Sequence, residues 1–116
     1  MGGSMSRNKG KRAELAIVHA LKAMGYEAHR SSQYCGANSD SDVECVDIPQ
    51  LFIEVKHVER LCVEKTLAQA EQDAAAKLKL PVVFHRRNGT EWILSLRMED
   101  MHRFVEMINA ARNNWA

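Results

Sequence analysis

The sequence predicts an α/β fold in which one mixed β-sheet is flanked by helices, in the order α-β-β-β-α-β-β-α. Three observations lead to this prediction. Apolar residues recur with the helical period in three segments. Short apolar runs rich in β-branched residues lie between those segments, and turn-forming residues separate the runs. A single sheet covered by the helices buries all of these apolar stripes together.

The first helix is expected to begin at Ser6, a capping residue, and to stop at Gly25, which suits the left-handed conformation after a helix. Between them, the apolar positions follow the 3.6-residue period: Ala13, Ile17, Val18, Leu21 and Met24. Residues 26–30 then predict a short strand. Residues 31–41 are small and polar and predict a loop.

Two strands are expected at 42–46 and 51–58, joined by a turn at Pro49. The alanine-rich segment from Val63 to about Leu78 predicts the second helix.

The last three elements are two strands and a helix. Asn88-Gly89 between the apolar runs 81–87 and 90–96 is typical of a type I′ hairpin. A final helix is expected from about Glu99 to Arg112, with Met101, Phe104, Val105 and Ile108 on its apolar side.

The length of 116 residues, with 46% hydrophobic and 27% charged side chains, is that of one soluble domain. "MGGS" before Met5 resembles an expression scar, so residues 1–5 are set aside and 6–116 are taken as the domain. No apolar stretch reaches the ~18 residues that a membrane span needs. Cys35, Cys45 and Cys62 have neither disulfide-framework nor zinc-site spacing, and they favour a reducing cytoplasm.

The net charge is only +1, but the charges are unevenly distributed. Residues 7–30 carry six basic side chains against two acidic ones, and residues 39–59 carry six acidic side chains against Lys56 alone. Two solvated faces would produce such a pattern. A metal-dependent enzyme that acts on a polyanion would produce it too, with carboxylates for the cation and basic residues for phosphates.

Glu54 and Lys56 interrupt the apolar strand 51–58. The side-chain period of a strand is two, so both lie on one face, opposite Leu51, Ile53 and Val55. A solvated ion pair, worth less than ~1 kcal/mol, would explain them. So would a site built on this strand.

Asp42 begins the neighbouring strand, and a turn near Pro49 would place it across from Glu54 and Lys56. Two carboxylates converging from adjacent strands suit Mg²⁺ or Mn²⁺. A lysine beside them can act on a metal-associated water or on a phosphate, which together equips the site to hydrolyse a phosphodiester. Asp40, Glu44 and Asp47 are rivals, and Asp42 is preferred because a strand pattern follows it directly.

Asp42 with Glu54-Val55-Lys56 resembles the D…ExK core of the PD-(D/E)xK nuclease superfamily, whose restriction-endonuclease-like fold has a central mixed sheet flanked by helices. Two further segments resemble its Holliday junction resolvases of archaeal and phage type. They are "NKGKRAEL", which carries Lys9, Gly10 and Glu14, and "GYEAHRSS", which ends in Arg30, Ser31 and Ser32. The resemblance runs from about residue 7 to residue 60.

The resemblance implies that Glu14, Asp42 and Glu54 bind Mg²⁺, or Mn²⁺ in its place, with help from the Val55 carbonyl. Lys56 would act at the attacking water. Arg30 and the Ser31–Ser32 loop would contact the DNA backbone near the scissile phosphate. The basic arm of Lys9, Lys11 and Arg12 would bind DNA as well.

The sequence departs from the family pattern at two positions. Ser41 stands where the superfamily has proline, and Leu15 stands where cellular relatives often have arginine, which favours the phage-like form.

Other residues keep two interpretations. Gln69 and Asp73 lie one turn apart on the second helix and would face the site or water; Gln69 is assigned to DNA binding. Arg86 and Arg87 would be solvated or clamp DNA. His57 and His85 are expected to be structural, and Trp92 is expected in the core.

The predicted function is that of a Mg²⁺-dependent, structure-selective endonuclease, a Holliday junction resolvase that nicks two opposed strands of a four-way junction. A two-fold substrate suggests a homodimer. The expected location is the cytoplasm, or the host cytoplasm for a phage protein. The alternatives are another nuclease of the superfamily, restriction-like or for repair, and a DNA-binding module without catalysis.

Overall fold

The computed structural model describes residues 2–31 and 41–113, and for residues 2–7 it describes the backbone alone. The first helix, α1 (Gly2–Ala23), begins before Ser6, so the prediction that Ser6 caps it is wrong. The sequence has no proline before Pro49, and nothing interrupts the helical hydrogen bonds at Ser6. Met24 does not join the apolar side of the helix either: it is 61% exposed, because the chain reverses at Gly25.

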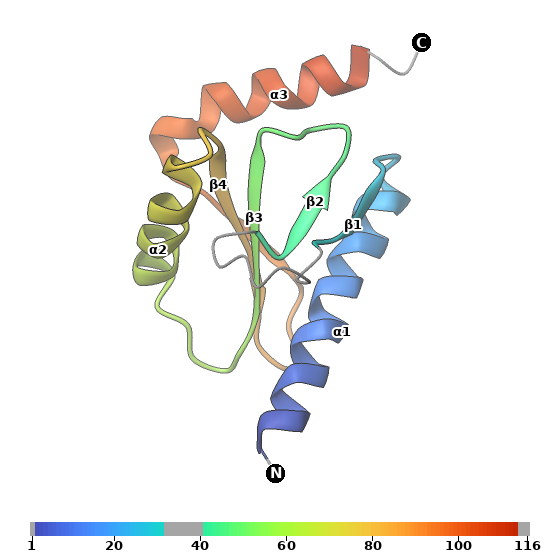
Figure 1. Cartoon of the computed structure of the whole chain (residues 1–116), viewed down its shortest axis with the longest axis vertical. Helices are drawn as coiled ribbons and strands as arrows, with labels where there is room; N and C mark the ends of the chain where they lie inside the picture. Colours follow the sequence, from blue (N-terminus) through green and yellow to red (C-terminus); the bar gives the residue numbers. More distant parts are fainter. Residues whose placement is uncertain (1, 32–40, 114–116) are drawn as a thin grey trace.

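The five strands form one mixed sheet in the order β1-β2-β3-β4-β5 (Figure 1). They are β1 (Ala28–Arg30), β2 (Val43–Cys45), β3 (Leu51–His57), β4 (Leu80–Arg86) and β5 (Ile93–Ser95). Only β3 and β4 pair in parallel, and the other neighbours are antiparallel. The order of elements is α-β-β-β-α-β-β-α, as predicted from the sequence.

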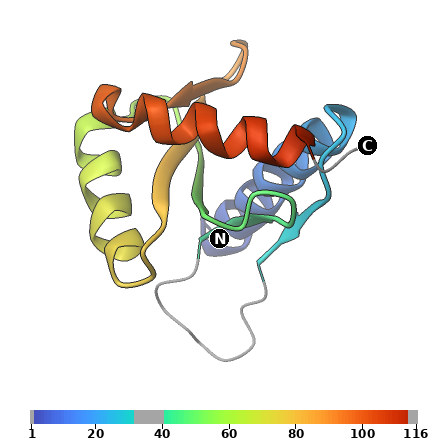
Figure 2. The ribbon, with the colours of Figure 1, turned by 90° about the horizontal axis from the view of Figure 1, so that it is seen from above.

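The helices cover both faces of the sheet. In the two views, α1 and α2 (Val63–Ala75) lie on opposite sides of β3 and β4, and α3 (Met101–Asn113) crosses the end of the sheet where β3 begins (Figures 1 and 2). A short 3₁₀ turn, η1 (Met98–Asp100), leads into α3. None of the helices in residues 2–31 and 41–113 has the length and apolarity that crossing a membrane requires.

The central strand β3 is apolar on both faces for its first half, which explains its hydrophobic sequence. Leu51, Ile53 and Val55 join the main core with α1 residues such as Ile17. Phe52 points the other way and packs with two alanines of α2, Ala70 and Ala74. The expected alternation along β3 is therefore confirmed. Glu54 and Lys56 fall on the side of Phe52, toward α2.

Pro81 lies inside β4, a position that usually disfavours proline because it lacks an N–H. The Leu80 N–H donates to the Gln50 carbonyl on the β3 side, at 2.8 Å. The backbone of the next residue therefore faces the β5 side, where pairing is restricted to Val83, Phe84 and His85. No ladder hydrogen bond is lost at Pro81.

The connection between β4 and β5 is a hairpin, but not the predicted type I′ turn. That turn requires a positive φ at both central residues. Of Asn88 and Gly89, only Gly89 has one, +79°. The Thr90 N–H donates to the Arg87 carbonyl, and six residues separate the strands. Asn88 takes another conformation because the Glu59 carboxylate accepts its backbone N–H at 2.7 Å and its side chain contacts His57.

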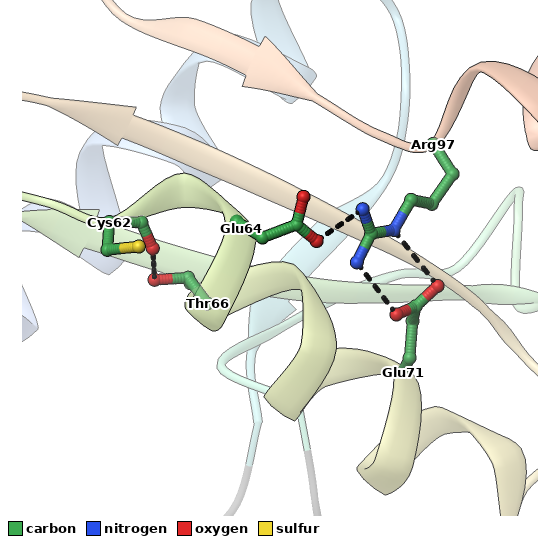
Figure 3. A network of polar contacts seen from close by, with 5 residues as sticks. All are labelled: Cys62, Glu64, Thr66, Glu71 and Arg97. Atoms are coloured by element: carbon green, nitrogen blue, oxygen red, sulfur yellow. Dashed lines mark hydrogen bonds and ion pairs between the residues drawn. The ribbon is translucent and has the colours of Figure 1, made fainter.

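Arg97 joins the segment before α3 to α2 (Figure 3). Its guanidinium donates two hydrogen bonds to the Glu71 carboxylate, at 3.1 and 3.2 Å, and approaches Glu64 to 2.6 Å. These bonds raise the pKa of Arg97 further above its usual range. A planar guanidinium suits such bidentate pairing, so the three side chains fix where the chain leaves β5 relative to α2.

Two helices end in the same hydrogen-bond pattern with different residues. After α1, Tyr26 N–H bonds to Leu21 O and Gly25 has φ +101°. After α2, Lys79 N–H bonds to Ala74 O and Leu78 has φ +55° with its side chain 88% exposed. Gly25 is the predicted stop. Leu78 takes up the same left-handed conformation with a Cβ, which costs roughly 1–2 kcal/mol. The second helix therefore ends at Ala75, before the expected Leu78.

We predict that Leu78→Gly raises the free energy of unfolding by about 0.5–1 kcal/mol, because glycine adopts this conformation without the steric penalty and no buried contact is lost. Urea denaturation followed by circular dichroism measures the change. Gly25→Ala is the matched control at the other helix and should lower stability by about 1 kcal/mol. Loss of stability in Leu78→Gly would contradict the assignment of strain to Leu78.

Candidate active site

The candidate site lies at the point where β2 separates from β3. Pairing of the two strands is restricted to Val43 and Ile53, extended by a bond from the Asp42 N–H to the Ile53 carbonyl at 2.9 Å. One step further, the Asp42 side chain replaces the missing strand: its Oδ2 accepts the Val55 N–H at 2.9 Å. Asp42 is thereby fixed beside Glu54, as the sequence predicts.

The Val55 carbonyl faces the same open edge. In a strand, the N–H and C=O of one residue point to the same side. The Val55 N–H points to Asp42, so its carbonyl also points away from β4 and toward the edge that β2 has left. This placement is compatible with the ligand role expected for that carbonyl.

Glu54 is a half-buried carboxylate with no hydrogen bond or ion pair to any residue that the structure describes. Burial raises its pKa from 4.5 to about 7, and the negative charge of Asp42 adds to the effect. Lys56, on the same face, offsets part of it, while Asp73 and Glu14 contribute further repulsion. The environment of Glu54 thus favours protonation of its carboxylate or neutralisation by a cation.

Asp42 experiences the same conflict in weaker form. Burial raises its pKa, and the Val55 N–H, Lys56 and Arg30 each lower it in part. The interaction of Lys56 with both Asp42 and Glu54 identifies it as the cationic member of the site. The simple alternative of a solvated Glu54–Lys56 surface pair does not fit this burial.

Glu14 and Arg30, expected to bind metal and DNA respectively, bind each other. The Arg30 Nε donates to Glu14 Oε1 at 2.8 Å, and the Glu14 side chain is 13% exposed. Burial raises the pKa of Glu14, Arg30 opposes the shift, and Asp42 adds to it. Glu14 therefore belongs electrostatically to the site, held at its border by Arg30.

Two of the three rivals of Asp42, Glu44 and Asp47, are engaged elsewhere. Glu44 is exposed and lies 3.6 Å from His29. The Asp47 carboxylate, in the turn between β2 and β3, accepts the Glu27 N–H at 2.7 Å. Asp40 lies outside the described residues, as does Ser32 of the predicted DNA-contacting loop.

Ser31 and Gln69 occupy different surroundings. Ser31 is buried, its N–H donates to the Asp42 carbonyl, and its Oγ has no hydrogen-bond partner among the described residues. Gln69 is exposed and bonds to Asp73 at 3.3 Å. Gln69 and Asp73 both lie on α2, and of the two it is Asp73 that raises the pKa of Glu54. The only indication in the sequence that Asp73 lies near the site was its position one helical turn after Gln69.

The donor chemistry of the site fits Mg²⁺ or Mn²⁺. Among the described residues, no group of three His, Cys, Asp or Glu side chains is arranged to hold a metal. Asp42 and Glu54 offer hard carboxylate oxygens, and burial raises the pKa of each, so a cation beside them would offset the cost of ionising both. Glu54 has to ionise to serve as a ligand.

The predicted basic arm divides in two. Lys9 and Arg12 line a cavity of about 290 Å³ together with His57, Arg86 and Trp92. Lys11 is exposed and does not line it. Trp92 is not simply a core residue, because it contacts the apolar cluster on one side and this cavity on the other. His57 bonds to Asn88 at 2.9 Å, and His85 bonds to the Ser95 hydroxyl at 2.8 Å, so both have the structural contacts expected of them.

The chain has the fold of a known nuclease. The structure of Hjc, a Holliday junction resolvase from the archaeal hyperthermophile Archaeoglobus fulgidus, is similar with a TM-score of 0.51 at 19% sequence identity, covering 72% of each chain. No protein-family model and no curated protein sequence matches the chain. The likeness agrees with the predicted mixed five-stranded sheet flanked by helices.

The electrostatics of the site predict an unusual pH dependence of stability. The native state holds the Glu54 proton more tightly than the unfolded chain does, so ionising Glu54 destabilises the fold as pH rises from about 4.5 to 7. Without metal, Glu54→Gln should remove roughly 2 kcal/mol of this loss. Thermal unfolding between pH 4.5 and 8 in EDTA measures it. Glu44→Gln, an exposed glutamate of β2, is the control and should follow the wild type. Identical pH profiles for Glu54→Gln and wild type would show that Glu54 is solvated.

Proposed function

We propose that this protein is a Mg²⁺-dependent, structure-selective DNA endonuclease, and most specifically a Holliday junction resolvase that makes paired nicks by phosphodiester hydrolysis. The observation that carries the proposal is the group of Asp42, Glu54 and Lys56 at the open edge of β3. The shared fold with a Holliday junction resolvase supports the choice of substrate.

A structural role does not account for Glu54. A half-buried carboxylate that three other acids repel, that Lys56 compensates only in part and that has no hydrogen bond among the described residues destabilises its own fold. In a site that binds a divalent cation the same arrangement becomes favourable, because the cation neutralises the carboxylates when it binds. Perturbed groups of this kind concentrate in functional sites.

Asp42 and Glu54 would hold the metal ion, with the Val55 carbonyl as a neutral ligand and Glu14 at the border. The bound ion supplies Lewis-acid activation of water and of the scissile phosphate. The hydrogen bond from the Val55 N–H fixes the Asp42 carboxylate, which supports this role. Glu14 would become available once Arg30 turns to a DNA phosphate, which would exchange one charged pair for another.

Lys56 would act on the attacking water or on charge that develops at the phosphate. Its charge acts on both Asp42 and Glu54, so its ammonium group would lie beside the reacting atoms. Hydrolysis adds the water oxygen to phosphorus, breaks one P–O bond of the backbone and leaves the departing oxygen with a proton. Arg30, Ser31, Ser32 and Gln69 are the proposed contacts to the DNA backbone near this point.

A homodimer would match the substrate. A four-way junction has two strands to cut that are related by two-fold symmetry, and two copies of one site on a two-fold axis would reach both. The cytoplasm, including that of a host cell for a phage protein, is the proposed location.

The second candidate is another nuclease of the PD-(D/E)xK type, for restriction or repair, and the third is a DNA-binding module. The charged group of Asp42, Glu54 and Lys56 favours a nuclease over the third, because a module that only binds DNA has no need of these converging charges. Cleavage and binding have to be measured separately to distinguish them.

In the first test, purified protein is incubated with a labelled four-way junction or with linear duplex, with Mg²⁺ or with EDTA. We expect paired nicks in the junction alone, and only with Mg²⁺. Asp42→Asn and Glu54→Gln should abolish cutting and keep binding, because each removes an anionic ligand. Mn²⁺ should raise the melting temperature of the wild type at pH 8 and not that of Glu54→Gln. Binding without cleavage in either metal would favour the DNA-binding module, and cutting of duplex would favour another nuclease.

The second test concerns Lys56. Lys56→Ala should slow single-turnover cleavage of the junction at saturating Mg²⁺ by about 10²–10³-fold, which is the cost of losing one positioned catalytic group. Metal binding should change little, since an ammonium is not a ligand. Lys56→Arg should rescue poorly, because a planar guanidinium differs in shape and does not release its proton. Lys65→Ala, on the exposed first turn of α2, is the control. A wild-type rate for Lys56→Ala would remove Lys56 from the mechanism.

A further inference from the structure

A basic cavity lies on the side of α1 that faces away from Glu14. It has a volume of about 290 Å³, and its polar lining comes from Lys9, Arg12, His57, Arg86 and Asn88, with Trp92 beside them. Ala13 and Ala16 line it as well. Their small side chains leave open space between the helix and the strand ends, where larger residues would fill it.

The sheet register explains how residues distant in sequence meet here. His57 and Arg86 are the last residues of β3 and β4 and are partners in the parallel ladder. Both point to the face covered by α1, since Val55 and Phe84, two residues earlier, join the core on that face. The early part of α1, with Lys9 and Arg12, lies beside these strand ends (Figure 1).

Arg86 is held in place but incompletely bonded. Its guanidinium carbon lies 5.6 Å from the centre of the Trp92 ring, which contacts His57 edge-on at 6.0 Å between ring centres. The Arg86 Nε is buried and has no hydrogen-bond partner among the described residues. A buried donor on a charged group without an acceptor is unfavourable, and an anionic oxygen in the cavity would satisfy it.

The positive charge of the cavity is not neutralised by its own walls. No acidic side chain lines it, and within residues 8–31 and 41–113 neither Lys9 nor Arg12 forms an ion pair. The nearby Glu59 carboxylate is bound to the backbone N–H of Asn88 and lines a neighbouring cavity, which Arg86 lines as well. Two arginines and a lysine around one space suit a phosphate, which accepts several charge-assisted hydrogen bonds at once.

We propose that this cavity binds one backbone phosphate of DNA, at a distance from the phosphate that is cut, and so sets where the strand lies relative to Glu54. The inference rests on the proposed function for the identity of the anion. It adds Arg86, His57, Asn88 and Trp92 to Lys9 and Arg12 as a single anchoring site. Arg12 and Glu14 are two residues apart on a helix, so the anchor and the carboxylates lie on opposite flanks of α1.

The experiment measures DNA binding in EDTA, so that neither metal binding nor cleavage contributes. All proteins carry Trp115→Phe, which leaves Trp92 as the one tryptophan of the chain. The variants are Arg86→Gln, the double variant Lys9→Gln/Arg12→Gln, and Lys22→Gln as the control, which changes an exposed lysine of the same helix outside the cavity. The probes are a four-way junction, a duplex of one of its arms, and inorganic phosphate.

Junction binding should change the Trp92 fluorescence. Arg86→Gln and the double variant should each weaken binding by about 10-fold, and each should reduce the slope of log K against log salt by about 1, the value for one phosphate. Lys22→Gln should stay within about twofold of wild type. The double variant changes surface positions of α1 and keeps the test valid if Arg86→Gln fails to fold.

Three results would overturn the proposal: unchanged affinity and slope in both cavity variants, no DNA binding by the wild type, or a Trp92 response to inorganic phosphate at micromolar concentration with none to DNA. The last would assign the cavity to a free anion. If the cavity variants weaken binding as expected but the wild type does not cut with Mg²⁺, the anchor stands and the nuclease proposal fails. The two proposals are therefore tested separately.

Discussion

The hydrogen bond from the Val55 N–H to the Asp42 carboxylate is the contact on which the candidate site depends. β2 stops pairing with β3 after Val43 and Ile53, and the half of β3 that follows would otherwise expose an unpaired edge. The Asp42 side chain takes over as acceptor for one step. The same bond brings the carboxylate to Glu54 and leaves the Val55 carbonyl on the open edge. One change of partner along the strand thus both satisfies the Val55 N–H and forms the candidate site.

Placing Glu54 on β3 has a cost in the free energy of folding. Leu51, Ile53 and Phe52 anchor β3 on both faces, so the strand cannot turn to bring Glu54 into water without exposing them. The carboxylate stays half-buried beside Asp42 and within the influence of Asp73 and Glu14, and its pKa rises to about 7. The buried apolar residues of β3 thus hold the destabilising carboxylate of Glu54 in position.

The fold and the strand-borne half of the site follow from local patterns in the sequence. The period of two puts Glu54 and Lys56 on one face, and the turn at Pro49 brings Asp42 alongside. The features that could not be predicted from the sequence depend on contacts between residues that are far apart in the chain. The Glu14–Arg30 pair, the approach of Asp73 to Glu54 and the contact of Arg86 with Trp92 each join separate elements. The prediction of a type I′ turn at Asn88-Gly89 was wrong for the same reason, because Glu59 and His57 hold Asn88 in another conformation.

Helix α1 explains how one small domain keeps strong charges of both signs close together. Glu14 points toward Arg30 and the carboxylates, whereas Lys9 and Arg12 point toward the ends of β3 and β4. Ala13, Ile17 and Leu21 occupy the face between them and seal the helix onto the sheet. If these charges faced one another, they would pair, and neither a cation nor a phosphate would find a free partner. Because the helix separates them, Glu14 pairs with Arg30 while Lys9 and Arg12 keep their positive charge at the cavity. The proposed metal site and the proposed phosphate anchor both depend on this separation.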